Sequence, residues 1–152
     1  MRLWRISDFA DLGGAGGRIV DGRWHSRGRP VVYLSEHPAL ALVENLVHLE
    51  IETGEIPETY QLLEIDAPEP VSRVERTAEA FDAENLAWRK DLRFTRSVGD
   101  AWLAQGPSAL LLVPSVVVPR SVNALLNPAH ADAALLRIGA IIRPAYDHRL
   151  FA

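Results

Sequence analysis

Cysteine is absent from the 152 residues of this sequence. Its absence excludes a disulfide framework, a thiolate nucleophile, and zinc or iron–sulfur sites built on cysteine. Long hydrophobic runs are absent as well, because the apolar stretch at residues 39–43 is interrupted by Glu44 and Asn45, well short of a membrane span. The first residues lack the apolar stretch of a signal peptide. We therefore expect a cytoplasmic protein that makes no contact with a membrane.

Positive charge is scarcer than negative charge. The sequence has 16 lysines and arginines against 20 aspartates and glutamates, for a formal net charge of −4. Proteins that bind nucleic acid through bulk electrostatics normally carry a basic face, so we expect no direct contact with nucleic acid. The hydrophobic share of 48% and the charged share of 24% are ordinary for a folded globular protein.

The pattern of apolar residues predicts one α+β domain over residues 1–152, without repeats or linkers. We expect strands at residues 3–6, 31–34, 60–65, 109–113, 116–118, 122–126 and 138–142. A helix is expected from about Glu36 to Glu50 with Ser35 as its N-cap, and residues 85–105 should be helical in two pieces separated by Gly99. Residues 11–30 hold six of the ten glycines and are expected to form a loop. Residues 66–84 are expected to form turns and exposed surface.

Three familiar chemistries lack their sequence patterns. The glycine-rich stretch at residues 13–17 lacks the Gly-Lys-Ser/Thr ending of a P-loop and fails the dinucleotide fingerprint, so its composition favours a connecting loop. The five histidines show no metal-binding spacing, and no metal site is expected. Ser115 lacks the Gly-x-Ser-x-Gly setting of a hydrolase nucleophile.

Arginines are concentrated early in the chain. Arg5 ends the first expected strand, and four more lie in the loop that follows it: Arg18, Arg23, Arg27 and Arg29. A guanidinium binds a phosphate through two parallel hydrogen bonds, so two converging arginines suit a diphosphate. Surface charge is the simpler interpretation for Arg18 and Arg29. At Arg23, the neighbouring glycine and tryptophan indicate a fixed backbone instead.

Glu44 and Tyr33 each have two interpretations. Glu44 lies opposite a helical stripe of leucines at positions 42, 46 and 49, so periodicity alone favours its exposure to water. In a cleft beside the arginine loop, the same carboxylate would accept a hydrogen bond from a ribose hydroxyl and stabilise a cationic sugar transition state. Tyr33 is either an ordinary core aromatic or a ring face for a cationic heterocycle.

Proline and asparagine mark strand ends in the last third of the chain. They occur at residues 112–115 and 126–130, with Asn123 between the two stretches. Turn chemistry alone explains such residues. Ser115 is equally suited to be a strand-end hydroxyl aimed into the cleft.

Taken in order, these motifs resemble the RES-domain family, which is named for an arginine, a glutamate and a serine. The resemblance covers nearly the whole chain and runs through Trp4-Arg5, Gly22-Arg23-Trp24, Tyr33-Leu34-Ser35, Glu44, Gly99-Asp100-Ala101-Trp102-Leu103, Val113-Pro114-Ser115, Asn127-Pro128-Ala129-His130 and Asp147-His148-Arg149-Leu150. Each motif is weak alone, but their common order makes coincidence a poor explanation. The sequence departs from the family pattern at His25, where many members carry asparagine.

The resemblance implies a bacterial toxin of a toxin–antitoxin pair whose partner is an Xre-type antitoxin. It implies an ADP-ribosyltransferase-like fold, with a mixed central β-sheet and flanking helices around a cleft for NAD. The implied reaction cleaves the nicotinamide–ribose bond of NAD and passes ADP-ribose to water, phosphate or a protein. NAD is then a substrate, and no separate cofactor is expected.

The resemblance also assigns roles to residues. Arg5 and Arg23 would hold the diphosphate, and both match motif positions, so either one is a candidate for the catalytic arginine. Tyr33 would stack near nicotinamide, and Glu44 would engage the ribose and offset its positive charge. Ser115 would orient the ribose or the amide of nicotinamide, and Asn127 completes the expected contacts with NAD.

An alternative from another class stays open. An RNA-directed toxin, or a non-catalytic nucleotide-binding module, would use the loop with Arg23 and Arg27 as its contact surface. The acidic net charge counts against this alternative.

Overall fold

One mixed sheet organises the computed structural model, which describes residues 1–49 and 56–151. Within these ranges the strand order is β4-β5-β6-β2-β1-β3-β7. The strands are β1 (Arg2–Ile6), β2 (Val32–Ser35), β3 (Leu62–Asp66), β4 (Arg73–Glu75), β5 (Leu110–Pro114), β6 (Val122–Leu126) and β7 (Arg137–Ile142). β4 and β5 pair in parallel and the other neighbours pair antiparallel. The predicted α+β class with a mixed central sheet is confirmed.

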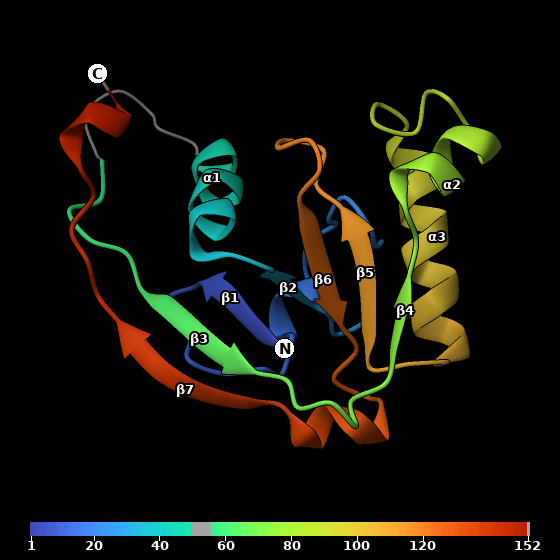
Figure 1. Cartoon of the computed structure of the whole chain (residues 1–152), viewed down its shortest axis with the longest axis horizontal. Helices are drawn as coiled ribbons and strands as arrows, with labels where there is room; N and C mark the ends of the chain where they lie inside the picture. Colours follow the sequence, from blue (N-terminus) through green and yellow to red (C-terminus); the bar gives the residue numbers. More distant parts are fainter. Residues whose placement is uncertain (50–55, 152) are drawn as a thin grey trace.

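Helices cover the sheet at two places. α1 (Pro38–His48) stands over β1 and β2, while α2 (Ala78–Glu84) and α3 (Leu92–Gln105) lie at the other end beside β4 and β5 (Figure 1). Short 3-10 turns occur at η1 (Ala15–Arg18), η2 (Ala131–Leu135) and η3 (His148–Leu150). No helix in the described ranges has the length and apolar character needed to cross a membrane.

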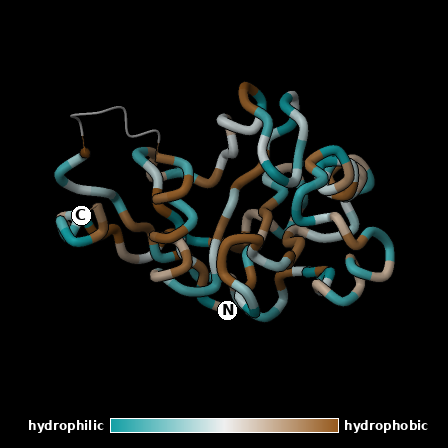
Figure 2. Tube along the Cα trace, turned by 90° about the horizontal axis from the view of Figure 1, so that it is seen from above, coloured by the Kyte–Doolittle hydropathy of each residue, from teal (hydrophilic) through white to brown (hydrophobic). Residues whose placement is uncertain are grey.

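The hydrophobic core has two parts because both faces of the sheet are covered. Side chains of a strand alternate between faces, and β5 divides accordingly: Leu110 and Leu112 join one buried cluster, whereas Leu111 and Val113 join the other. The second cluster also holds Trp24, Phe81, Trp88 and Trp102. Hydrophobic stretches run through the middle of the molecule, and hydrophilic ones dominate its outer turns (Figure 2).

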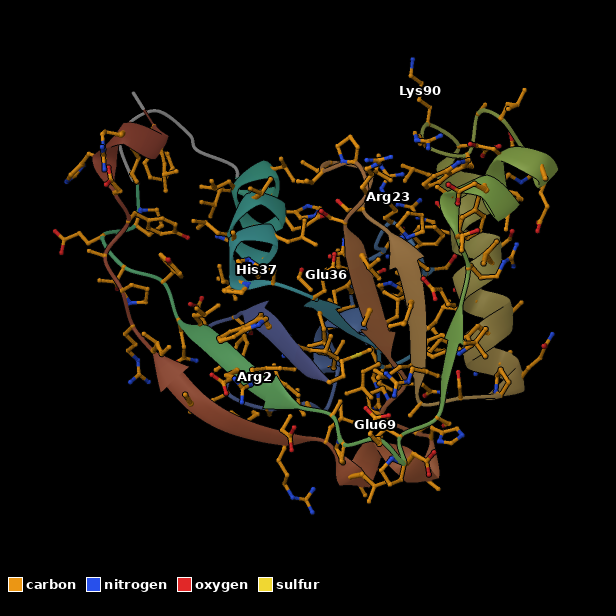
Figure 3. The ribbon with its side chains drawn as sticks, in the orientation of Figure 1. Arg2, Arg23, Glu36, His37, Glu69 and Lys90 are labelled. Carbon is orange, nitrogen blue, oxygen red and sulfur yellow. The ribbon has the colours of Figure 1, made fainter. Side chains whose placement is uncertain are left out.

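The start of α1 differs from the prediction. His37, not Ser35, is the N-cap, and its side chain accepts a hydrogen bond from the backbone N–H of Ala39; His37 lies at the base of α1 (Figure 3). Ser35 remains in β2, where it pairs with Trp4 of β1 and Asn123 of β6. The expected helix end at Glu50 lies outside the described residues. The predicted leucine stripe is only half-buried, and Leu40 and Ala41 are the buried residues of the helix.

Three other predictions are wrong. Residues 66–84 are not only turns and exposed surface, because they contain β4 and α2 and bury Phe81 completely. Residues 85–105 hold a single helix, α3, which passes through Gly99 without a break. Residues 116–118 are not a strand, since they bend in the connection between β5 and β6. The loop at residues 11–30 is correct apart from the single turn η1.

Candidate active site

A cleft of about 490 Å³ opens beside α1, at the end of the sheet where β5 ends and β6 begins. This volume is within the range of small-molecule sites. Four of the residues expected to act on NAD line it: Arg5, Arg23, Tyr33 and Glu44. Arg23 lies near the loop ends of β5 and β6, away from the opposite end of the sheet, where Glu69 lies (Figure 3). Further lining residues with polar side chains are Trp4, Asp21, His25, Ser35, Asn45, His48 and Asn123.

Glu44 is held by two side chains from the sheet. The hydroxyl of Ser115 donates a hydrogen bond of 2.6 Å to Oε1, and the amide Nδ2 of Asn123 donates one of 2.7 Å to the same oxygen. Hydrogen bonds to an ionised group are stronger than neutral ones. Glu44 lines the cleft, and these two hydrogen bonds fix its orientation there.

Ser115 supports Glu44 from behind. It is 6% exposed and does not line the cleft. Its hydroxyl oxygen accepts hydrogen bonds from the backbone N–H groups of Val117 and Val118, at 3.1 and 3.0 Å. Because the hydroxyl oxygen accepts these two hydrogen bonds, the hydroxyl hydrogen points to Glu44.

Asn127 does not reach the cleft. It follows β6 at the end opposite Asn123, is 4% exposed, and accepts a hydrogen bond from the backbone N–H of Ala129. Turn chemistry, the simpler of the two interpretations of this stretch, accounts for its side chain. The structure brings Asn123 to the cleft instead, and the sequence signal for it was an amide inside the apolar strand at residues 122–126.

Tyr33 and His25 join the arginine loop to the sheet. The Tyr33 hydroxyl accepts from the backbone N–H of Trp24 at 3.1 Å and lies 2.7 Å from Nδ1 of His25. Nε2 of His25 lies 3.1 Å from the carbonyl oxygen of Gly17, which can only accept. Nε2 of His25 therefore carries a proton, and in the neutral ring Tyr33 donates to Nδ1. Burial raises the pKa of the Tyr33 phenol well above its usual range.

Helix α3 fixes the same loop from the other side. The Thr95 hydroxyl donates to the carbonyl oxygen of Arg23 at 2.7 Å, and Nε of Arg96 donates to the carbonyl oxygen of Gly22 at 2.8 Å. The carboxylate of Asp100 accepts from the backbone N–H of Ser26 at 2.8 Å. These bonds give Arg23 the fixed backbone that its neighbours in the sequence predicted.

The two candidate arginines differ in their surroundings. Arg5 is half-buried and donates to the carbonyl oxygen of Asp11 at 2.9 Å. Burial lowers the pKa of its guanidinium, and the Asp11 carboxylate partly opposes that shift. Arg23 is also half-buried, but its hydrogen bond, which it donates to the carbonyl oxygen of Arg89 at 3.1 Å, lies at the surface. Arg27 is exposed and does not line the cleft.

Acidic and histidine side chains do not gather elsewhere into a metal site. Across residues 1–49 and 56–151, no group of three or more His, Asp or Glu side chains is arranged to hold an ion. The polar side chains of the cleft include the clamped carboxylate of Glu44, two arginines, the hydrogen-bonded pair of Tyr33 and His25, and two amides, Asn45 and Asn123.

Comparison with known proteins identifies the family. The RES domain model matches residues 2–147. The chain belongs to the RES domain family. A relative from Pseudomonas putida, "Toxin Res", is 43% identical over 138 residues, covering 91% of this chain and 92% of its own. A relative from Sphingobium sp., "Prs ADP-ribosylating toxin", is 38% identical over an alignment of 158 positions, covering 97% and 95%. At these levels of identity the chain is a RES-domain toxin.

The fold has a counterpart among solved structures. A chain of the MbcT–MbcA toxin–antitoxin complex of M. tuberculosis aligns with a TM-score of 0.72, covering 94% of this RES domain and 83% of that chain. Sequence identity is 17%, so this likeness shows the shared fold alone. Of the motifs quoted from the sequence, those at residues 4–5, 22–24, 33–35 and 44 line the cleft.

Proposed function

We propose that this RES-domain toxin consumes NAD by cleaving the bond between nicotinamide and ribose. The observation that carries the proposal is the carboxylate of Glu44, clamped by Ser115 and Asn123 inside a cleft that also contains Arg5 and Arg23. A fixed negative charge beside two guanidinium groups suits a substrate with a diphosphate at one end and a sugar that becomes positive at the other. The Sphingobium relative, named as an ADP-ribosylating toxin, supports the same chemistry.

In the proposed reaction, the bond that breaks joins ribose C1′ to the ring nitrogen of nicotinamide. The electron pair of that bond moves to the nitrogen and neutralises the pyridinium charge, so nicotinamide leaves as a neutral molecule. Positive charge passes to the sugar as an oxocarbenium ion, which the Glu44 carboxylate stabilises. An acceptor nucleophile then bonds to C1′ and releases its proton.

The remaining residues bind and orient the substrate. Arg5 and Arg23 hold the diphosphate, with Arg5 acting in the more buried position. Tyr33 contributes its ring face near the nicotinamide, because its hydroxyl is already occupied by Trp24 and His25. Ser115 acts through Glu44 rather than on NAD, since it does not line the cleft.

Water, phosphate and a protein side chain are all possible acceptors in chemical terms. The name of the Sphingobium relative, "Prs ADP-ribosylating toxin", makes a protein the first acceptor to test. The counterpart solved as a toxin–antitoxin complex supports an antitoxin partner, and we propose an Xre-type antitoxin that closes the cleft. NAD serves as a substrate in this proposal, without a separate cofactor.

The test is release of free nicotinamide from NAD by the purified protein, with and without phosphate and cell lysate. Glu44→Gln keeps the shape of the side chain and its contact with Ser115 but removes the charge. We expect turnover to fall by about a hundredfold or more, the range for loss of a group that stabilises transition-state charge, with an unchanged melting temperature. Glu79→Gln, an exposed glutamate of α2 outside the cleft, is the matched control. Absence of nicotinamide under every condition would refute the proposal.

A further inference from the structure

Asn123 is an amide in an otherwise apolar strand. In β6 it pairs with Ser35 of β2 on one side and with Val113 of β5 on the other. A polar side chain inside a sheet is unfavourable unless its hydrogen-bonding groups are satisfied. Both ends of this amide are satisfied, and each end has a different partner.

The two partners fix the direction of the amide. The Ser35 hydroxyl donates to Oδ1 of Asn123 at 2.9 Å, and Nδ2 of Asn123 donates to Oε1 of Glu44 at 2.7 Å. If the amide turned by half a rotation, its oxygen would face the carboxylate of Glu44, and two acceptors would repel each other. The carboxylate of Glu44, which only accepts, therefore selects the orientation in which Asn123 presents a donor to it, and the Ser35 hydroxyl satisfies the amide oxygen at the other end.

The clamp also distinguishes the two oxygens of Glu44. Both hydrogen bonds to this carboxylate, from Ser115 and from Asn123, end on Oε1. Among the hydrogen bonds of residues 1–49 and 56–151, none ends on Oε2. Because Glu44 lines the cleft, Oε2 is the oxygen available to a bound ligand.

We propose that Asn123, held in place by its hydrogen bond to Ser35, is a positioning residue that aims Oε2 of Glu44 at the ribose of the substrate. The inference rests on the proposed cleavage of NAD, because turnover is one of its readouts. Asn123 lines the cleft, but its amide nitrogen is used by Glu44 and its amide oxygen by Ser35, so we assign its effect to Glu44 and not to a contact with NAD. Ser35 affects Glu44 only indirectly, through its hydrogen bond to Asn123.

The first experiment separates kcat from KM. Asn123→Leu keeps the approximate size of the side chain and removes its donor. We expect kcat for nicotinamide release to fall about tenfold to a hundredfold, as for other groups that orient a catalytic residue, while KM for NAD changes by no more than about twofold. Asn127→Leu is the matched control, because Asn127 is a buried, hydrogen-bonded amide at the other end of the same strand. Each kcat is calculated from the concentration of folded protein.

The second experiment measures NAD binding without turnover. In the Glu44→Gln background, adding Asn123→Leu should leave the Kd of NAD within about twofold of its value in Glu44→Gln alone. A tenfold rise in Kd would mean that Asn123 contacts the substrate directly and would overturn the inference. The measurement does not require the doubly substituted protein to be active.

Ser35→Ala provides a milder variant in case Asn123→Leu folds poorly. It leaves the donor on Asn123 but removes the hydroxyl that holds the amide oxygen in place, so kcat should fall by less than in Asn123→Leu. Suppose that the parent protein releases nicotinamide, but that Asn123→Leu and Ser35→Ala have the same kcat as the Asn127→Leu control. The inference about Asn123 then fails, while the proposed function stands. If parent protein releases no nicotinamide, the proposed function fails.

Discussion

Gly99 of α3 lies directly against the carbonyl group of Trp24. A β-carbon at position 99 would overlap the Trp24 carbonyl oxygen. Thr95 and Arg96, one turn earlier on the same helix, hold the carbonyl oxygens of Arg23 and Gly22. The close approach permitted by Gly99 therefore sets the position of the loop that carries Arg23.

Gly99→Ala should displace this loop. Overlap with backbone atoms cannot be relieved by a side-chain rotation, so we expect a loss of about 1–3 kcal/mol in the free energy of unfolding, typical of overpacking. Release of nicotinamide should fall with it, because Arg23 moves away from the cleft. Urea denaturation monitored by tryptophan fluorescence measures the first effect.

Gly16→Ala is the control for that stability measurement, because a β-carbon at Gly16 would meet open space. Its free energy of unfolding should match or exceed that of the parent protein, since alanine restricts the unfolded chain more than glycine does. Equal stability of Gly99→Ala and Gly16→Ala would show that the loop does not depend on the contact with α3.

The buried hydroxyl of Tyr33 should make the protein sensitive to alkaline pH. Burial raises the pKa of this phenol in the folded state, while in the unfolded chain it ionises near pH 10. Between these values the folded state holds one more proton than the unfolded state. The free energy of unfolding therefore decreases as pH rises above about 10, by up to about 1.4 kcal/mol per pH unit from this group.

Tyr33→Phe tests that slope. The variant should be less stable than the parent protein at neutral pH, by about 1–3 kcal/mol, because Trp24 and His25 lose their hydrogen-bond partner. Above pH 10 its stability should decline less steeply. If the free energy of unfolding changes with pH in the same way for both proteins, Tyr33 ionises freely in the folded state.

The fold was largely predictable from local patterns. The apolar runs that became β1, β2, β3, β5, β6 and β7 were identified, because alternation and β-branched residues mark buried strands. The segment with β4 and α2 was missed because its acidic residues suggested exposure, although Phe81 anchors α2 in the core. Gly99 was taken as a break because glycine weakens helices. Its contact with Trp24 is tertiary and invisible in one sequence.

The sequence predicted several residues of the candidate site but not the hydrogen bonds that connect them. The helical spacing of the leucines opposite Glu44 favoured exposure of its side chain to water. Only the fold shows that this side of α1 faces a cleft. Asn123 and Ser35 are 88 residues apart, so their pairing follows from strand order, which local patterns do not give. Asn127 fits the same sequence pattern as a site residue but lies at the wrong end of β6.

Arg5 and Arg23 should contribute differently to NAD binding. Arg5 is half-buried, so a lysine in its place cannot reproduce the planar fork and leaves a cation poorly solvated. We expect Arg5→Lys to raise KM for NAD more than Arg23→Lys does. Added salt should weaken binding more when Arg5 is replaced than when Arg23 is replaced. The remaining attraction then comes from Arg23, whose guanidinium hydrogen-bonds at the surface and is screened by salt. KM measured at low and high ionic strength decides this, and a larger effect of Arg23→Lys would reverse the assignment.

Tyr146 connects the segment after β7 to α1, the helix that carries Glu44. Its hydroxyl accepts a hydrogen bond of 2.7 Å from Nδ2 of Asn45, which is next to Glu44 on α1. Tyr146→Phe should lower the free energy of unfolding by about 1 kcal/mol, the value of one hydrogen bond, and should lower kcat because α1 is held less firmly. Tyr60→Phe is the matched control. The Tyr60 ring packs against Tyr146 at 4.6 Å between centroids, and the Tyr60 hydroxyl makes no hydrogen bond among the described residues. Equal kcat values for the two variants would show that the Tyr146 hydroxyl does not influence the cleft.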